Sequence, residues 1–308
     1  MSGTSMKTPG LLPGLLAIAF TILTMGRADA QGGAPASTLQ RITETGTIRI
    51  GYSVEDFPFS YRDENGNVAG YSTELCVRVV DILRQELKLP AIEIAFVERN
   101  PRNRVSMLRS GELDIECVAS TNNAERRKSV GFTFPHFVTG TQFVSLKASN
   151  LNTIADLAGH TVAATTGTTN IGQLNAVNRE RSLNIAVMPV ETHKDAFKLV
   201  TDGRASAFVM DGILLAALVA GAENPDDYAI SSDALGWPEP YGLMVRIDDD
   251  EFRSAVNAAL VQIYSSGEME GLYARWFTQP IGPRGINLRL PMSAEVKKAF
   301  SQPSDPAQ

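Results

Sequence analysis

VSMLRSGELDI, residues 105–115, has a counterpart in the second half of the chain, FKLVTDGRASA, residues 197–207. Each stretch is typical of a short helix that ends at a glycine, Gly111 or Gly203, and is followed at once by a buried strand. Two units of the same kind predict two similar α/β lobes. The alternative, which this match leaves open, is the ordinary alternation of helices and strands within a single sheet.

Predicted strands and helices alternate on both sides of these stretches. In the first half, strands are predicted at 47–51, 92–97 and 113–118, a hairpin at 57–71, and helices at 72–87 and 103–109. In the second half, strands are predicted at 161–164, 185–190 and 205–210, with helices from 168 and over 194–201. Further helices are predicted at 249–265, around 269–276 and at 293–300. This alternation predicts an α/β fold with mainly parallel sheets, covered on both faces.

Two extended apolar stretches, residues 138–146 and 242–247, are predicted to cross between the lobes. The chain is expected to return to its first lobe once the second is complete. On this interpretation lobe 2 comprises residues 140–240. Lobe 1 comprises residues 38–139 together with residues 241–304, which include a C-terminal tail.

Residues 1–30 are predicted to be a secretory signal peptide. Lys7 precedes an apolar run over 11–25 that is short for a membrane span, and small residues precede the expected cleavage after Ala30. The alternative is an uncleaved anchor helix. Cleavage removes Lys7, Arg27 and Asp29, which leaves 26 of 28 basic and 33 of 34 acidic residues and a net charge of −7. We therefore expect a soluble, periplasmic monomer that does not bind nucleic acid.

The chain has two cysteines, Cys76 in a predicted helix and Cys117 in a predicted buried strand. Export permits a disulfide between them if the helix packs on the strand, and two buried free thiols are the equal alternative. The three histidines, His136, His160 and His193, lie far apart in the sequence. We therefore expect neither a metal site nor a cofactor.

In parallel α/β sheets, ligands bind beyond the carboxyl ends of the strands. The residues that follow the predicted strands are mostly polar, small or cationic. They are Ser53 and Glu55, then Asn100, Arg102 and Arg104, then Ala119, Ser120 and Thr121, then Thr165–Thr169, then Thr192 and His193, and finally Asp211. With Arg126 a turn beyond Thr121, this set suits the opposite charges of an amino-acid zwitterion.

Arg126 and Asp211 are the candidates for those two charges. The guanidinium fork of Arg126 matches a carboxylate, and Asp211 is placed to receive an ammonium group. The residues Gly167, Thr168 and Thr169 open a predicted helix, whose free N–H groups favour an anion. Each has a plainer interpretation: a surface arginine for Arg126, and helix N-caps for Asp211 and the Gly-Thr-Thr segment.

Taken together, several motifs resemble the family 3 extracellular solute-binding proteins, which serve ABC transporters for amino acids. The motifs are TIRIG (47–51), PFS (58–60), GY (70–71), SGELD (110–114), TNNAER (121–126) and GTT (167–169). The resemblance extends from residue 38 to about residue 304 and is greatest to the periplasmic glutamate/aspartate-binding proteins. It implies the type II periplasmic binding protein fold, with two lobes that are joined by two crossover strands and close on the ligand.

The resemblance also implies roles for individual residues. Arg126 matches the arginine that binds the α-carboxylate of the ligand, and Thr121 and Thr168 match positions that assist it. Asp211 matches the acid that receives the α-ammonium group. The implied partners are a free amino acid and the membrane permease of an ABC transporter.

The side-chain end of the implied site carries both matches and departures. Arg104 and His193 match positions that face the side-chain carboxylate in binders of acidic amino acids. Ser53 stands where those proteins have a further arginine, and Ala119, like residue 101, stands where they have a serine. Arg99 or Arg102 is a candidate to replace the missing cation. An altered pocket leaves glutamine or asparagine open as alternative ligands.

Two other classes of function share this fold. A cyclohexadienyl dehydratase-like enzyme needs a carboxylic acid poised in the cleft, and Glu55 is the candidate, although nothing near it in the sequence is expected to raise its pKa. A sensory subunit that presents its ligand to a receptor would have the same cleft. The resemblance favours a binding protein that performs no chemistry on its ligand.

Overall fold

The computed structural model describes residues 1–6, 10, 37–282 and 284–305. Most of the expected signal peptide lies outside these residues and stays a prediction. Every helix and strand described below lies in one compact unit within residues 36–308. Among the described residues, no helix combines the length and apolar character needed to span a bilayer.

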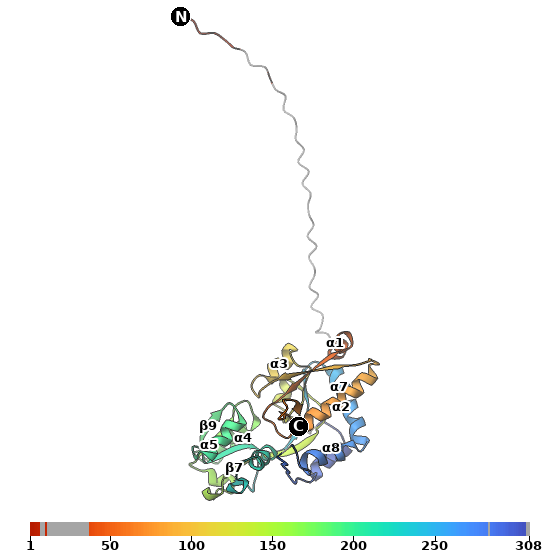
Figure 1. Cartoon of the computed structure of the whole chain (residues 1–308). Coiled ribbons are helices and arrows are strands. Elements are labelled where there is room, and N and C mark those ends of the chain that lie inside the picture. Colours follow the sequence, from red (N-terminus) through yellow and green to blue (C-terminus); the bar gives the residue numbers. More distant parts are fainter. Residues whose placement is uncertain (7–9, 11–36, 283, 306–308) are drawn as a thin grey trace. The chain divides into compact units, whose positions relative to one another are not determined.

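One five-stranded sheet defines lobe 1, in the order β4-β1-β5-β13-β6. The strands β4, β1 and β5 are parallel, and β13 runs antiparallel between β5 and β6. The strand bounds are β1 Thr47–Tyr52, β4 Glu93–Glu98, β5 Ile115–Glu116, β6 Gly131–Phe132 and β13 Met244–Val245. The helices of this lobe are α1 Thr38–Thr45, α2 Tyr71–Glu86, α3 Arg104–Ser110, α7 Asp250–Ser265, α8 Glu268–Phe277 and α9 Ala294–Ser301. Figure 1 shows α2, α7 and α8 side by side in this lobe.

A second sheet defines lobe 2, in the order β11-β7-β10-β8-β9, with β12 also paired to β7. The strands β10, β8 and β9 are parallel, whereas β7 is antiparallel to its neighbours. The strand bounds are β7 Phe137–Leu146, β8 Thr161–Thr165, β9 Ala186–Val190, β10 Ala207–Asp211, β11 Tyr228–Ile230 and β12 Leu235–Tyr241. The helices are α4 Thr169–Glu180, α5 His193–Thr201 and α6 Gly212–Ala220. The predicted α/β class with mainly parallel sheets is confirmed.

The stretches 105–115 and 197–207 occupy equivalent places in the two sheets. Gly111 ends α3 and leads into β5, and Gly203 ends α5 and leads towards β10. Both glycines have positive φ, 75° and 68°, which is the backbone conformation that ends a helix in the left-handed region. Because β5 and β10 belong to different sheets, the alternative of a single sheet is excluded.

The strands β7 and β12 pair antiparallel and carry the chain between the two sheets. The first expected crossover, residues 138–146, coincides with β7. The second is placed too late, because the return strand is β12 and residues 244–245 already belong to the sheet of lobe 1. The crossover strands are anchored by aromatic packing: Phe59 lies 4.9 Å from Phe137 and 5.2 Å from Tyr241, measured between ring centroids.

Other departures from the predicted elements are local. The strand expected at 113–118 is confined to β5, and the hairpin strands β2 Tyr61–Arg62 and β3 Val68–Ala69 are shorter than expected. The helices α1 and α6 were not expected. The sequence of α6, GILLAALVA, is apolar on every side and so lacks the periodicity of an amphipathic helix.

Cys76 of α2 and Cys117, which follows β5, form a disulfide, so the open choice between a bridge and two free thiols is decided. Both residues are buried in the core of lobe 1. The bridge ties α2 to the sheet beneath it.

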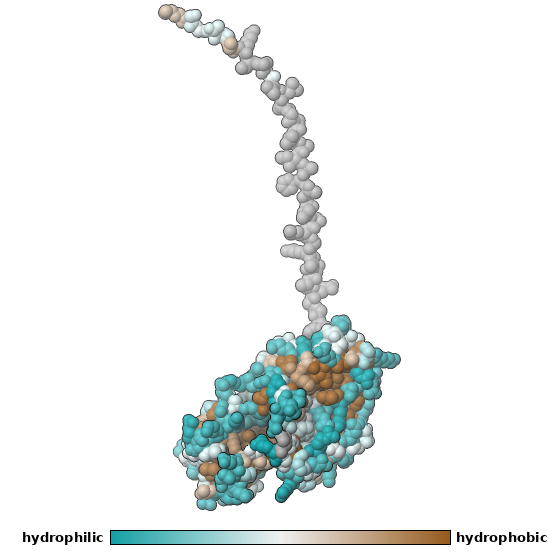
Figure 2. Space-filling model, in the orientation of Figure 1, coloured by the Kyte–Doolittle hydropathy of each residue, from teal (hydrophilic) through white to brown (hydrophobic). Residues whose placement is uncertain are grey.

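Figure 2 shows that the visible face of the folded unit is largely hydrophilic, with apolar residues gathered near α2 and α7.

Candidate functional site

Residues that follow strands of both sheets line one small pocket. Lobe 1 contributes residues that follow the carboxyl ends of its strands, and lobe 2 contributes residues after β8, β9 and β10. The lining residues from lobe 1 are Asp56, Arg99, Pro101, Arg104, Ala119, Thr121 and Arg126. Those from lobe 2 are Thr168, Thr169, Asn170, His193, Met210, Asp211 and Leu214. The pocket therefore brings together eight of the residues singled out from the sequence: Arg104, Ala119, Thr121, Arg126, Thr168, Thr169, His193 and Asp211. Its lining does not include other residues that were expected after strands: Ser53, Glu55, Asn100, Arg102, Ser120, Thr165, Thr166, Gly167 and Thr192.

Arg126 opens a short 3₁₀ helix, Arg126–Lys128, that follows Thr121 in lobe 1. Its Nη1 donates a 3.0 Å hydrogen bond to the carbonyl oxygen of Thr121, which fixes the guanidinium in the pocket. Among the described residues, no carboxylate lies within ion-pairing distance of Arg126. Burial lowers the pKa of Arg126, and the negative potential of Glu116 and Asp211 opposes that shift. A half-buried guanidinium without an ion pair in the protein is suited to an external carboxylate.

Asp211 ends β10 in lobe 2 and is buried. Its Oδ1 accepts a 2.7 Å hydrogen bond from Nδ2 of Asn170, and its Oδ2 accepts a hydrogen bond from the hydroxyl of Tyr241. Although Asp211 occupies the N-cap position of α6, its side chain makes no capping hydrogen bond. The plainer interpretation of Asp211 as a helix cap is therefore excluded, and the carboxylate is held towards the pocket instead.

The start of α4 lies across the pocket from Thr121. Oγ1 of Thr121 and Oγ1 of Thr169 are 3.5 Å apart and join the two lobes. Thr168 turns its hydroxyl back, and Oγ1 donates a 2.7 Å hydrogen bond to the carbonyl oxygen of Thr165. The first N–H groups of α4 are thereby placed at the pocket wall, where the helix dipole favours an anion.

Arg104 and His193 line the pocket from opposite lobes. Arg104 donates from Nη1 to Oγ of Ser120 at 3.0 Å and from Nη2 to the carbonyl oxygen of Gly167 at 3.2 Å. Burial, and then the nearby Arg126, lowers the pKa of Arg104 to about 9. His193 opens α5, and its Nδ1 lies 2.8 Å from Oγ1 of Thr165.

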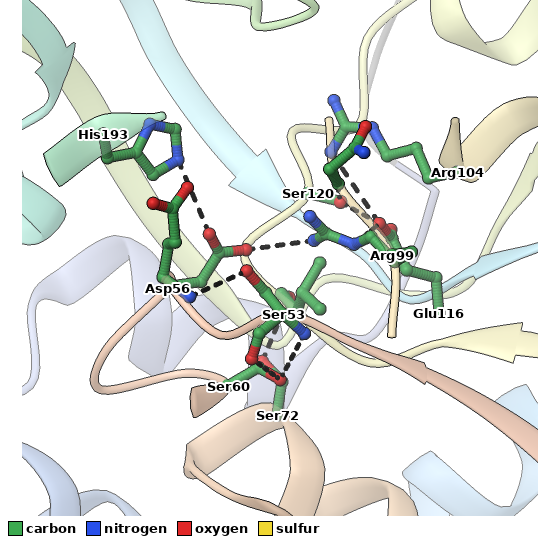
Figure 3. A network of polar contacts seen from close by, with 12 residues as sticks. Ser53, Asp56, Ser60, Ser72, Arg99, Arg104, Glu116, Ser120 and His193 are labelled. Carbon is green, nitrogen blue, oxygen red and sulfur yellow. Dashed lines mark hydrogen bonds and ion pairs between the residues drawn. The ribbon is translucent and has the colours of Figure 1, made fainter. Parts of the chain in front are cut away.

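Three buried charged residues beside Arg104 form a network that Figure 3 shows from close by. Nη2 of Arg99 lies 3.0 Å from Oδ2 of Asp56, and Nε of Arg99 lies 2.5 Å from Oε1 of Glu116. Oδ1 of Asp56 also lies 3.5 Å from Nε2 of His193, so Asp56 reaches across to lobe 2. The interactions with Arg99 and His193 outweigh the effect of burial and lower the pKa of Asp56.

Asp56 and Glu116 were not predicted to belong to the site. The signal for Asp56 was its place just after the first strand, beside Glu55. Glu116 gave no usable signal, because it lies within an apolar predicted strand, and such a pattern predicts core residues rather than a binding site. Arg99 was named only as a candidate replacement for a cation, and it does line the pocket. Arg102, the other candidate, is exposed and pairs with Glu191 at 2.8 Å.

Ser53 does not line the pocket. It is buried beneath it, where its backbone N–H donates a 3.0 Å hydrogen bond to Oγ of Ser60. Ala119 does line the pocket but offers only a methyl group. Neither Ser53 nor Ala119 therefore contributes a polar side chain to the pocket wall, whereas Arg99 does.

Glu239 of β12 is a further buried acid that the sequence analysis missed. Oε2 accepts a 2.8 Å hydrogen bond from Oγ1 of Thr141, and Oε1 accepts a 3.0 Å hydrogen bond from Nε2 of Gln173. Nδ2 of Asn170 donates both to Thr141 and to Asp211, so one chain of hydrogen bonds links Glu239 to Asp211. Burial, and then the charge of Asp211, raises the pKa of Glu239 to about 7.

Glu55 differs from its sequence-based description. Burial raises the pKa of Glu55, contrary to the expectation that its surroundings would not. Its side chain lines a neighbouring groove together with Lys194 and Phe197, and it is absent from the lining of the pocket between Arg126 and Asp211.

Comparison with known proteins gives a consistent result. The family model for bacterial extracellular solute-binding proteins, family 3, matches residues 48–279. The chain is 37% identical over 298 residues, 96% of this chain and 98% of the relative, to the L-glutamate/L-aspartate-binding protein of Pseudomonas aeruginosa. It is 36% identical over 296 residues, 94% of this chain and 97% of the relative, to the glutamate/aspartate import solute-binding protein of Escherichia coli.

Among solved structures, an ancestral amino-acid-binding protein, a precursor of cyclohexadienyl dehydratase, superimposes with a TM-score of 0.67 and 28% identity. The alignment covers 79% of this chain and 100% of that chain. The curated relatives above are transport binding proteins rather than enzymes.

Proposed function

Because the chain belongs to the bacterial extracellular solute-binding proteins of family 3, we propose that it captures one free amino acid between its lobes and presents it to the permease of an ABC transporter. The observation that carries the proposal is that Arg126 of lobe 1 and Asp211 of lobe 2 line one pocket. An amino acid carries the two complementary charges on adjacent groups. A ligand that contacts both lobes only when they are closed shifts the protein towards its closed form.

We propose glutamate or aspartate as the ligand. The names of the relatives from Pseudomonas aeruginosa and Escherichia coli support this choice. So do Arg99, Arg104 and His193, which give the wall of the same pocket three cationic or potentially cationic side chains. Glutamine and asparagine are the alternatives. The protein is proposed to act in the periplasm as a monomer, after removal of residues 1–30, with no cofactor and with lobe bounds at residues 139/140 and 240/241.

We propose that the protein performs no chemistry on its ligand. The carboxyl group of Glu55, whose pKa is raised by burial, is the feature that a dehydratase would need, but it faces a neighbouring groove. Incubation of the purified protein with prephenate or arogenate is expected to yield no product. Formation of an aromatic product would establish the enzyme instead.

The experiment that tests the proposal is a thermal-shift screen of all free amino acids, followed by isothermal titration calorimetry. Glutamate and aspartate are expected to raise the melting temperature most. Arg126→Ala is expected to weaken binding by about 2–5 kcal/mol, as for the loss of one partner of a buried charge pair. Arg179→Ala, at an exposed arginine near the end of α4, is the matched control and is expected to leave binding unchanged. If no amino acid stabilises the protein, the proposed function is wrong.

A further inference from the structure

The part of the pocket beside Asp56 holds three cationic or potentially cationic side chains, Arg99, Arg104 and His193. Two of them have their polar atoms engaged within the protein. Arg104 donates to Ser120 and to the carbonyl oxygen of Gly167, and the two ring nitrogens of His193 lie against Thr165 and Asp56. These contacts orient both side chains without any ligand.

Arg99 is held from three directions. It directly follows β4, and its backbone N–H donates a 3.0 Å hydrogen bond to the carbonyl oxygen of Tyr52 at the end of β1. Its guanidinium lies between the carboxylates of Asp56 and Glu116. The side chain is 1% exposed, as buried as that of a core residue. The ends of three neighbouring strands thus fix both the position and the orientation of the guanidinium.

Among the described residues, two buried nitrogens of Arg99, Nε and Nη1, make no hydrogen bond, whereas Nη2 donates to Asp56. Nε still lies 2.5 Å from Oε1 of Glu116 in an ion pair, so Nη1 is the nitrogen of the guanidinium that has no polar partner. A buried donor that is left unpaired costs free energy, and for a charged group this cost is larger than for a neutral one. Because Arg99 lines the pocket, a ligand is the group that can supply the missing acceptor.

We propose that Arg99 determines the specificity for an acidic ligand, by donating from Nη1 to the side-chain carboxylate of the bound amino acid. The inference rests on the proposed function and adds the residue that selects the ligand. Asp56 and Glu116 act as positioning residues that hold the guanidinium, and their two charges balance those of Arg99 and Arg104. A neutral amide oxygen is a weaker acceptor for the Nη1 donor than a carboxylate oxygen, because it carries no charge. A site built to hydrogen-bond one ligand group discriminates against an analogue that leaves its donor less well paired.

The test compares L-glutamate with L-glutamine, which has the same shape but no side-chain charge. Dissociation constants of both are measured by calorimetry for the wild type and for Arg99→Met combined with Asp56→Asn, which removes a cation and an anion together and so leaves the buried charge balanced. The readout is the dissociation constant of L-glutamine divided by that of L-glutamate. The wild type is expected to prefer glutamate by about tenfold or more, the effect of one charged hydrogen bond. The double variant is expected to lose that preference.

Three further variants separate this role from a structural one. Asp56→Asn alone is expected to keep the preference for glutamate, because the asparagine oxygen can still accept the hydrogen bond from Nη2 of Arg99 that positions the guanidinium. Arg102→Gln, at the exposed arginine three positions away, is expected to leave the ratio unchanged. Arg99→Lys keeps the positive charge but lacks the planar guanidinium, so it is expected to lower the ratio. It serves as the test if the double variant fails to fold.

The outcomes are distinct. A double variant that folds, as judged by its melting transition, and still prefers glutamate to the wild-type extent would overturn the inference, as would an unchanged ratio in Arg99→Lys. A wild type that binds glutamine as tightly as glutamate would overturn the inference but leave amino-acid capture intact. A wild type that binds no amino acid would instead remove the proposed function itself.

Discussion

Gly167 of lobe 2 lies against the backbone of residue 101 in lobe 1: a β-carbon on Gly167 would stand 2.8 Å from the carbonyl oxygen of Pro101. That distance is shorter than any ordinary contact, and the neighbouring atom belongs to backbone that cannot turn aside. Gly167 also contributes no side chain to the cleft, so the backbone of lobe 2 comes close to the backbone of lobe 1 there. This arrangement of the two lobes therefore requires glycine at this position.

We expect Gly167→Ala to weaken ligand binding because the added methyl group opposes closure of the lobes. Gly167 also has a positive φ of 78°, so part of any loss of stability comes from backbone strain. Gly203→Ala is the matched control. Gly203 lies in the same lobe and has a similar φ of 68°, but nothing lies within 4 Å of the added β-carbon. Calorimetry should show weaker binding for Gly167→Ala alone. Equal affinities in the two variants would mean that the contact with Pro101 does not control closure.

The buried carboxylate of Asp211 predicts a trade-off between affinity and stability. Asp211→Asn removes the charge that is proposed to receive the ligand ammonium group, so binding is expected to weaken by about 2–5 kcal/mol. The same change removes the repulsion that helps to raise the pKa of Glu239, so the ligand-free protein is expected to melt at a higher temperature. Asp195→Asn, at an acid in the first turn of α5, serves as the control. A variant that binds normally would exclude Asp211 from the site.

The pKa of Glu239 predicts how stability depends on pH. Its pKa is about 7 in the folded protein against 4.5 in a free glutamate, so protonation is favoured by folding. The folded state is therefore destabilised by this group as pH rises from about 4.5 to 7, by up to about 3 kcal/mol. Glu239→Gln should abolish that part of the dependence. Urea unfolding of the ligand-free wild type and variant at pH 5 and pH 8 measures it, and identical pH profiles would contradict the assignment.

Much of the fold follows from local sequence patterns. The expected helices at 72–87 and 249–265 coincide with α2 and α7 to within a residue, because their apolar side chains recur at helical spacing. The strand β12 escaped prediction, since its sequence LGWPEPY contains two prolines and a glycine, which usually mark loops. It exists because β7 supplies a partner strand nearly a hundred positions earlier, and no local pattern records that pairing.

The site was predictable where chemistry and strand ends coincide. Arg126 and Asp211 were predicted as candidates because they follow predicted strands and carry the charges that complement a zwitterion, and both line the pocket. Glu116 and Glu239 were not found, because each lies within a strand and is stabilised by residues distant in the sequence. The role of Arg99 depends on which of its nitrogens is paired, and only three-dimensional contacts reveal that.

The disulfide between Cys76 and Cys117 predicts a large share of the stability of lobe 1. It closes a loop with a sequence separation of 41 residues, for which the loss of entropy in the unfolded chain corresponds to about 4 kcal/mol. The variant Cys76→Ala combined with Cys117→Ala is therefore expected to unfold at a lower urea concentration than the oxidised wild type. Dithiothreitol should lower the midpoint of the wild type but leave that of the variant unchanged. If the wild type and the variant, each with and without dithiothreitol, unfold at the same urea concentration, then packing of α2 on the sheet, rather than the bridge, stabilises this lobe.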